Sequence, residues 1–359
     1  MKTLLAIDVG AGTQDILLYD PDRPVENCVK LVLPSQTRVV AARVRRATAQ
    51  RAPVFLCGNL MGGGACSSAV KAHLKAGLAV CAAPLAAKTL DNDLGRVEGM
   101  GVKLTSHRPE GAVPITTGDI DLAALAQALE RFEVELPGRV AVAVQDHGDC
   151  PGVGNRFFRF RHWEEFVREG GDLTRTLHAA PPPFFTRMEA VQRDVPGALL
   201  MDTGPAAVWG ALQDATVAER AGEGVVVLNI GNGHTFGVLV RGRRVWGLFE
   251  HHTGLIDSGK LKVLVDRLIE GTLTNAEVYD DGGHGCFIHE GYRELGRFAF
   301  VAVTGPNRRL ARDLGYYAAV PHGDMMLSGC FGLVAAAREA GSAGATAGAA
   351  GGARGRDDA

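Results

Sequence analysis

The residues that could do chemistry begin near the N-terminus, where a short apolar strand ends on a carboxylate. Leu4–Ile7 leads into Asp8, and the chain then turns through Gly10, Gly12 and Thr13. Glycine permits positive φ and lets a ligand approach the bare backbone, and the amide N–H groups of such a turn can converge on an anion. Asp8 could hold a hydrated Mg²⁺ beside that anion. The segment therefore predicts one half of a phosphate clamp, and the alternative is an ordinary β-hairpin whose turn contains glycine.

A second copy of this pattern lies far down the chain. The apolar run 225–228 ends on Asn229 and turns through Gly231 and Gly233 before a hydroxyl residue, Thr235, and another apolar strand. Two such hairpins, one in each half, resemble the phosphate-1 and phosphate-2 loops of the actin, Hsp70 and sugar-kinase ATPase superfamily. In that superfamily the two loops face each other across a cleft and hold the nucleotide phosphates.

The resemblance implies ATP and Mg²⁺ as ligands, with Asp8 as the metal ligand and a catalytic residue. A third element, the strand 300–303 and the tight turn after it, resembles the adenosine motif of the same superfamily; the alternative is a plain strand-to-helix turn. The implied nucleotide-binding residues are Gly10, Gly12, Thr13, Gln14, Asn229, Gly231, Asn232, Gly233, His234, Thr235, Thr304, Gly305 and Asn307.

The second hairpin departs from the superfamily pattern at its first polar position. The phosphate-2 loop usually begins with Asp, whereas this chain has Asn229, and His234 stands where a small or hydroxyl residue is common. An amide adds no negative charge for Mg²⁺. The sequence thus indicates a phosphotransferase or a slow ATPase acting on a small acceptor or a partner enzyme, and the alternative is a non-catalytic nucleotide sensor or scaffold.

Further carboxylates follow two apolar runs. Asp146 and His147 come after Val140–Val144, and Asp202 comes directly after Leu199–Met201. Either carboxylate could serve as the general base or water-positioning residue of phosphoryl transfer. The alternatives are a surface turn for Asp146 and a helix N-cap for Asp202.

Two other catalytic motifs are only partly present. Asp202 opens an Asp-Thr-Gly triplet of the aspartic-protease kind, but those enzymes need two carboxylates that share a proton, and the chain has one triplet. Gly254 to Lys260 approaches a P-loop, but Leu261 stands where the Mg²⁺-binding hydroxyl belongs.

Histidines and cysteines form a further candidate, a metal site or second reaction centre. His251 and His252 are adjacent on a strand and so point to opposite faces, which keeps them from sharing one ion easily. The other residues that could converge are His147, Cys150, His284, Cys286 and His289.

Four motifs together resemble a family of bacterial and archaeal proteins that are sometimes labelled as relatives of the pyruvate formate-lyase activating enzyme. They are Gln-Asp-His-Gly at 145–148, Asp-Thr-Gly at 202–204, His-His-Thr-Gly at 251–254 and Asp-Gly-Gly-His-Gly-Cys at 281–286. The label implies radical chemistry at a [4Fe–4S] cluster held by C-x-x-x-C-x-x-C. The seven cysteines contain no such spacing, so the sequence predicts that the chain is not a radical S-adenosylmethionine enzyme.

The elements that must position these residues repeat in each half as three strands, a helix, a strand and a helix. The order predicts an α/β protein, and the resemblance to the actin, Hsp70 and sugar-kinase superfamily implies duplicated ribonuclease-H-like, actin-like ATPase domains, with mixed sheets flanked by helices and a central nucleotide cleft. We expect an N-terminal lobe at 1–215 with insertions, a C-terminal lobe at 216–340 and a disordered Ala/Gly tail at 341–359.

Composition excludes several classes of protein. A net charge of -2 gives no reason to expect nucleic acid or an anionic membrane as partner. The N-terminal apolar run is too short for a signal peptide and no run is long enough to span a bilayer, which predicts a cytoplasmic protein. An odd number of cysteines without C-x-x-C argues against a disulfide framework. An oligomer remains open.

Overall fold

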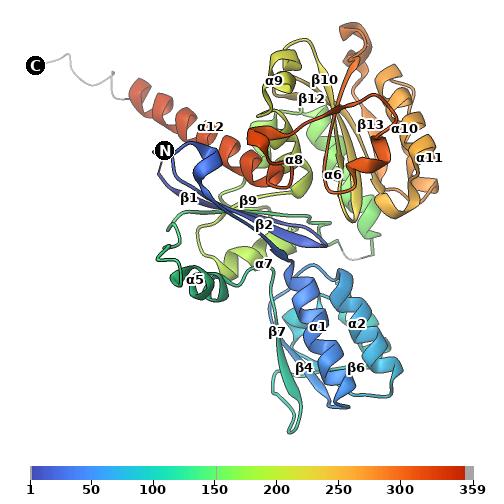
Figure 1. The fold of residues 1–359 in the computed structure, drawn as a ribbon. Coiled ribbons are helices and arrows are strands. Elements are labelled where there is room, and N and C mark those ends of the chain that lie inside the picture. The colour runs from blue at the N-terminus through green and yellow to red at the C-terminus, as the bar shows by residue number, and fades with distance from the viewer. Residues whose placement is uncertain (1, 151, 352–359) are drawn as a thin grey trace, which may run out of the picture.

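Two large sheets that share a five-strand order dominate the computed structural model, which describes residues 2–150 and 152–351 (Figure 1). The N-terminal sheet has the order β3-β2-β1-β8-β9, and the C-terminal sheet has the order β13-β12-β11-β10-β14-β15. In each sheet the first three strands in sequence are antiparallel neighbours, and two later strands, β8 and β9 or β14 and β15, run parallel to the first. The C-terminal sheet has one additional edge strand, β13, which is antiparallel to β12. This repetition confirms the predicted duplicated ribonuclease-H-like, actin-like ATPase fold.

The bounds of these strands follow the apolar runs of the sequence. The N-terminal sheet consists of β1 (Leu4–Val9), β2 (Thr13–Tyr19), β3 (Val29–Pro34), β8 (Val140–Val144) and β9 (Leu199–Met201). The C-terminal sheet consists of β10 (Val225–Ile230), β11 (His234–Arg241), β12 (Arg244–His252), β13 (Gly285–Ile288), β14 (Phe300–Thr304) and β15 (Tyr317–Ala318).

Two helices, α8 (Thr203–Ala211) and α12 (Ser328–Gly351), lie between the sheets, and one apolar core joins both helices to one face of each sheet. Glycine makes their close contact possible. A Cβ at Gly210 would overlap the carbonyl of Ser328, and a Cβ at Gly332 would overlap the carbonyl of Ala206. The small residues of the two helices therefore allow their backbones to approach closely.

The outer faces of the two sheets are covered by different helices. The N-terminal sheet buries its other face against α5 (Leu122–Glu130) and α7 (Thr186–Asp194). The C-terminal sheet buries its other face against α10 (Ser258–Glu270) and α11 (Asn275–Asp280). Helix α6 (Asn155–Arg168) contacts β12 and β13, so a helix that lies in sequence between β8 and β9 of the N-terminal sheet packs on the C-terminal sheet.

A third sheet is inserted between β3 and β8. Its four strands are all parallel, in the order β6-β5-β4-β7, and have their own apolar core with α1 (Gln36–Ala49) and α2 (Gly64–Lys75). Figure 1 shows this sheet extending away from the two larger ones. The strands and short helices of the insertion are β4 (Val54–Gly58), β5 (Val80–Ala82), β6 (Val102–Leu104), β7 (Val113–Thr117), α3 (Pro84–Ala87) and α4 (Leu94–Gly99).

The last helix continues beyond Gly341, where the sequence placed the start of the Ala/Gly tail, and residues 352–359 lie outside the described part of the chain. None of the described helices has both the length and the hydropathy of a bilayer-spanning segment. The remaining helices are α9 (Ala215–Ala221) and the 3₁₀ turns η1 (Val25–Asn27), η2 (Leu173–Thr176), η3 (Thr253–Leu255), η4 (Glu290–Leu295), η5 (Arg308–Ala311) and η6 (Pro321–Gly323).

Candidate nucleotide cleft

Each of the two glycine turns is closed by a backbone hydrogen bond at the same position. The N–H of Gly10 donates to the carbonyl of Thr13 at 2.9 Å, and the N–H of Gly231 donates to the carbonyl of His234 at 2.9 Å. None of the glycines in these turns has a positive φ, so the expectation that glycine serves backbone freedom here is wrong. Space is the reason for glycine, since a Cβ at Gly231 would stand 2.8 Å from the carbonyl oxygen of His234.

In each turn, one serine or threonine donates hydrogen bonds to two of the carbonyl oxygens. Ser35 donates its N–H and its Oγ to the carbonyls of residues 11–12, both at 3.3 Å. Thr253 donates its Oγ1 to the carbonyl of Gly231 and its N–H to the carbonyl of Gly233, both at 2.9 Å. These bonds fix the orientation of both turns.

The N–H groups of the turns remain unpaired. Within the described residues, the N–H groups of Ala11, Gly12, Asn232 and Gly233 donate to no protein acceptor. The turns also meet, because a Cβ at Gly12 would stand 2.6 Å from Nδ2 of Asn232. Residues of both turns line a cleft of about 550 Å³. Clustered amide N–H groups of this kind are suited to bind an anion.

Two carboxylates of the first hairpin lie on the cleft beside its turn. Asp8 and Asp15 are directly opposite each other in the antiparallel pair of β1 and β2, and both line the cleft. Oδ1 of each is buried without a hydrogen-bond partner. Burial and the charge of Asp15 raise the pKa of Asp8 well above its ordinary value, and burial raises the pKa of Asp15 to about 7. A divalent cation would supply the charge that both carboxylates lack, so the residues fit Mg²⁺.

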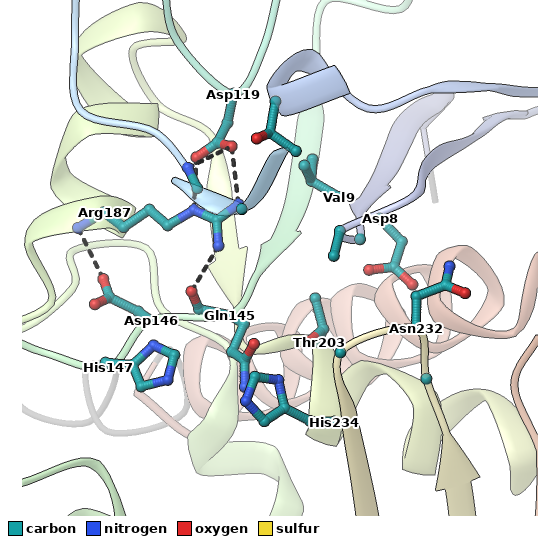
Figure 2. A pocket seen from close by; sticks show the side chains of 18 of the residues that line it. Asp8, Val9, Asp119, Gln145, Asp146, His147, Arg187, Thr203, Asn232 and His234 are labelled. Carbon is teal, nitrogen blue, oxygen red and sulfur yellow. Dashed lines mark hydrogen bonds and ion pairs between the residues drawn. The ribbon is translucent and has the colours of Figure 1, made fainter. Parts of the chain in front are cut away.

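The backbone also approaches Asp8 closely from the opposite side. A Cβ at Gly329, near the start of α12, would overlap the carboxylate of Asp8. The carboxylate is thereby held between β1 and α12, and it points into the cleft beside Asn232 (Figure 2).

The predicted adenosine motif forms another wall of the cleft. Thr304 and Gly305 line it together with Pro306, Met325 and Met326. Gly305 has φ +96, and a Cβ there would stand 2.5 Å from the carbonyl oxygen of Ile230.

Asn307 does not line the cleft as predicted, because its side chain is used behind the second turn. Its Nδ2 donates to the carbonyl of Gly231 at 3.0 Å and to Oδ1 of Asn232 at 3.3 Å. It is a positioning residue for that turn.

Gln14 and Thr235 occupy matching places in the two hairpins, and both side chains lie away from the cleft. Gln14 donates its Nε2 to the carbonyl of Pro34 at 3.2 Å. Thr235 is fully buried, and its hydroxyl lies 3.0 Å from that of Thr253. Strand alternation explains this correction: the cleft receives the side chains of Thr13 and His234 instead.

Asp146 is engaged in holding the backbone, which contradicts its predicted role as a base. Its two carboxylate oxygens accept the N–H groups of Gly148 at 2.8 Å and of Arg187 and Met188 at 2.9 Å. A carboxylate whose oxygens are engaged in this way is not free to accept a proton from a substrate.

Asp202 is engaged in the same way. It caps α8 by accepting the N–H of Gly204 at 3.0 Å, and its other oxygen accepts the N–H of Asp146 at 3.0 Å. The helix N-cap that the sequence left open for Asp202 is confirmed.

A buried arginine that sequence reasoning missed joins the two halves of the molecule. Arg159 on α6 donates to Asp202 at 2.7 and 3.0 Å and to Glu250 on β12 at 2.7 and 3.0 Å. Gln145 donates its Nε2 to the same Glu250 carboxylate at 2.9 Å. The guanidinium holds the pKa of Glu250 below its usual range despite burial. No local signal distinguishes Arg159 from the other arginines of its helix.

A second ion pair closes another side of the cleft (Figure 2). Arg187 on α7 binds the buried Asp119 through two hydrogen bonds of 2.7 and 2.8 Å, and its third nitrogen donates to the carbonyl of Gln145 at 2.8 Å. Asp119 also accepts the N–H of Gly62 at 3.2 Å. The pair therefore ties the inserted sheet to the N-terminal sheet.

The predicted histidine and cysteine cluster forms only in part. His251 and His252 point to opposite sides, as expected: His251 is buried and its Nε2 lies 3.1 Å from Asp281, whereas His252 lines the cleft. Cys286 donates to the carbonyl of Leu273 and lies outside the cluster. His147, His234 and His284 do converge, and this group, the only one of its kind among the described residues, contains no cysteine. The cysteines thus do not fit a three-thiolate iron–sulfur site.

One family model matches residues 61–310 of the chain, which is more than half of its length, and its description reads "Putative pyruvate format-lyase activating enzyme (DUF1786)". No curated protein has a sequence significantly similar to the chain.

Several solved structures are distantly similar. The PilM–PilN type IV pilus biogenesis complex gives 13% identity and a TM-score of 0.36 over 93% of this chain and 98% of that one. A ROK family glucokinase from Streptomyces griseus, in complex with glucose and AMPPNP, has 12% identity and a TM-score of 0.32 over 94% of this chain and 98% of that one. The Aquifex aeolicus PPX-GPPA enzyme has 12% identity and a TM-score of 0.30 over 85% of this chain and 68% of that one. At such scores the fold assignment rests on the duplicated strand order.

Proposed function

The chain belongs to the DUF1786 family, and we propose that this member binds Mg·ATP between its two glycine turns and cleaves or transfers the terminal phosphoryl group. One observation carries the proposal. Two turns from different sheets line one cleft and carry unpaired N–H groups, and beside the first turn lie two carboxylates that lack a counter-charge. Amide donors for phosphate oxygens next to carboxylates for a hard cation are the requirements of a metal–nucleotide site.

Each part of the cleft has a role in this proposal. The N–H groups of the two turns and the hydroxyl of Thr13 bind phosphate oxygens. Asp8 and Asp15 hold Mg²⁺, which would neutralise the charge on the phosphate oxygens when bound. Thr304 and Gly305 border the adenosine.

The acceptor enters where the inserted sheet meets the cleft. Gly62–Gly64 and Lys88 line this side, and the Arg187–Asp119 pair closes it. A small polar acceptor would meet amide and cationic donors there, which favours a small molecule over a nucleic acid. Asp8 is the cleft carboxylate that we assign to catalysis, because Asp146 and Asp202 are occupied by the backbone and by Arg159.

A nucleotide sensor is the second candidate, and a specific observation favours it. The second hairpin presents the amide of Asn229 where the first presents the carboxylate of Asp8, and the two other candidate bases are engaged. A site of this kind can hold ATP without hydrolysing it quickly.

Calorimetric titration of Mg·ATP into the purified protein tests the binding, with ATP in excess EDTA as the control. We expect saturable binding of about one nucleotide per chain that is lost without Mg²⁺. Absence of binding to folded protein would refute the proposal. A coupled assay for ADP then separates the two candidates: steady release that disappears in Asp8→Ala supports the enzyme, and intact bound ATP supports the sensor.

A further inference from the structure

Three histidines from three different strands or strand ends converge at the wall of the cleft. His147 follows β8, His234 opens β11 and His284 directly precedes β13. One ring nitrogen of each lies within 4.8 Å of one nitrogen of both others, and Nε2 of His147 is 3.2 Å from Nε2 of His284. Figure 2 shows His147 and His234 lying close together below Gln145.

The ring nitrogens of this trio are poorly satisfied by protein partners. Nε2 of His234 is buried and has no hydrogen-bond partner within the described residues. Nε2 of His147 and Nε2 of His284 face each other at 3.2 Å. A neutral imidazole has one donor and one acceptor nitrogen, and leaving such a nitrogen buried and unpaired is unfavourable. The backbone nonetheless holds the rings in place, because the N–H of His284 donates to the carbonyl of Glu250 at 2.8 Å.

The surroundings keep the imidazoles of His234 and His284 in the neutral form. Burial and the charge of Arg159 lower the pKa of His234 to about 4 and that of His284 to about 3. Imidazoles in the neutral form are the ones that ligate metals. Arg159 itself is paired with two carboxylates, Asp202 and Glu250, so this buried group carries a net charge of −1.

We propose that His147, His234 and His284 form a binding site for one divalent transition-metal ion of the zinc type, with a fourth coordination position open to the cleft. Ligand nitrogens at 2.0–2.1 Å from a tetrahedral ion stand about 3.4 Å apart. The 3.2 Å between His147 and His284 meets this requirement already. The ring nitrogens of the trio lie within 4.8 Å of one another, so a side-chain rotation of His234 brings it into the coordination sphere. Three histidines and an open position form the usual arrangement of a catalytic zinc ion.

The site would connect the two halves of the protein. His147 belongs to the N-terminal sheet and the other two ligands to the C-terminal sheet, so the ion bridges the cleft. His234 directly follows the second glycine turn, which places the open position where an oxygen of an anionic ligand or a water molecule can reach it. Binding of the metal does not depend on the proposed nucleotide function.

Zinc titration of EDTA-treated, dialysed protein without nucleotide tests the site, with bound metal measured by elemental mass spectrometry. We expect about one Zn²⁺ per chain, and affinity at least about 100-fold weaker in His147→Gln and in His284→Gln. His107→Gln, at an exposed histidine of the inserted sheet, is the matched control and should bind as wild type does. Less than about 0.1 Zn²⁺ per chain, or equal affinity in all variants, would overturn the proposal.

X-ray absorption at the zinc edge of the wild-type protein gives an answer even where a variant does not fold. We expect three imidazole nitrogens near 2.0–2.1 Å and no sulfur. A sulfur shell near 2.3 Å, or oxygen ligands alone, would place the ion elsewhere. A fourth imidazole would add His252, whose ring lies 4.7 Å from that of His234, and would contradict the open position. Failure of Mg·ATP to bind would leave these results unchanged, so the two proposals fail separately.

Discussion

The two glycine hairpins have the same backbone and different side chains. In both, the first glycine N–H closes the turn, the next two N–H groups are unpaired and a hydroxyl residue holds the carbonyls from behind. The first hairpin presents Asp8, Thr13 and Asp15 to the cleft, and the matching positions of the second are Asn229, His234 and Phe236.

The two hairpins divide the polar groups of the cleft between them. Duplication of the fold explains the shared amide donors, because these depend only on backbone geometry. The carboxylates lie in the first hairpin alone, since the second has Asn229 and Phe236 at their positions, and the second hairpin has His234 where the first has Thr13. The predictions below test this division, beginning with the largest expected effect.

Removing the charge of the first hairpin should abolish most nucleotide binding. Asp8→Asn keeps the shape of the side chain and removes the carboxylate, so we expect Mg·ATP affinity to fall at least about 100-fold, or about 3 kcal/mol. Asn229→Ala, at the matching position of the second hairpin, should change the affinity less than about fivefold. Calorimetry measures both, and equal losses would mean that the hairpins contribute alike.

The carboxylate pair should also make the metal-free protein less stable as the pH rises. Asp15 lies opposite Asp8 on β1. Burial and the charge of Asp324 raise the pKa of Asp15 from 3.8 to about 7, although a hydrogen bond with the Thr13 hydroxyl lowers it. The folded state therefore binds this proton more tightly than the unfolded chain does. The resulting stabilisation is complete below pH 4 and is lost as the pH rises through about 7, by about 4 kcal/mol in all, of which about 2–3 kcal/mol is lost between pH 5 and pH 8.

Urea denaturation between pH 5 and pH 8 without Mg²⁺ measures this loss. Asp15→Asn removes one of the two titrating carboxylates and should reduce the dependence of the unfolding free energy on pH, whereas Asp8, whose pKa is also raised, keeps part of it. The second hairpin has Phe236 at this position and contributes no such dependence. An unchanged slope in the variant would show that another group is responsible.

A methyl group added to the first turn should weaken Mg·ATP binding more than one added to the second turn. A Cβ at Gly12 would stand 2.6 Å from Nδ2 of Asn232, whereas a Cβ at Gly233 would stand 4.0 Å from Cβ of Ala11. Gly12→Ala therefore has to displace Asn232, and we expect about a tenfold loss of Mg·ATP affinity, or about 1.4 kcal/mol. Gly233→Ala should lose less than about twofold. The reverse order in a titration would contradict the observed contact.

The residues that hold the turns from behind should affect stability unequally. Thr253→Val leaves the buried hydroxyl of Thr235 and the carbonyl of Gly231 without their partner, which we expect to cost about 1–2 kcal/mol of unfolding free energy. Ser35→Ala removes a bond of 3.3 Å and should cost about 0.5 kcal/mol or less. Urea denaturation of the two variants distinguishes these values, and equal costs would mean that the two turns are fastened equally.

Much of the fold could be predicted from the sequence because its signals are local. Apolar runs that end on Asp8 and Asn229, each followed by Gly-x-Gly, mark both hairpins, and strand alternation separates His251 from His252. The same rule, applied to the first residue after each turn, would have placed Gln14 and Thr235 away from the cleft. Applying the rule requires knowing at which residue the second strand begins. The backbone hydrogen bond from Gly10 to Thr13 sets that residue, and residue types alone do not reveal it.

The rest of the site depends on contacts between distant parts of the chain. Arg159 meets Asp202 and Glu250 across 43 and 91 residues, and Arg187 meets Asp119 across 68. His147 and His284 are 137 residues apart. No periodicity of the sequence indicates these pairs, because the order and orientation of the strands bring them together.

Amide chemical shifts test the central claim most directly, since the two turns are proposed to bind the phosphates through their backbone. In a deuterated, ¹⁵N-labelled sample, saturating Mg·ATP should move the N–H resonances of Ala11, Gly12, Asn232 and Gly233 downfield together. All four resonances unchanged at saturation, or a response from one turn alone, would contradict the account of a clamp formed by both hairpins.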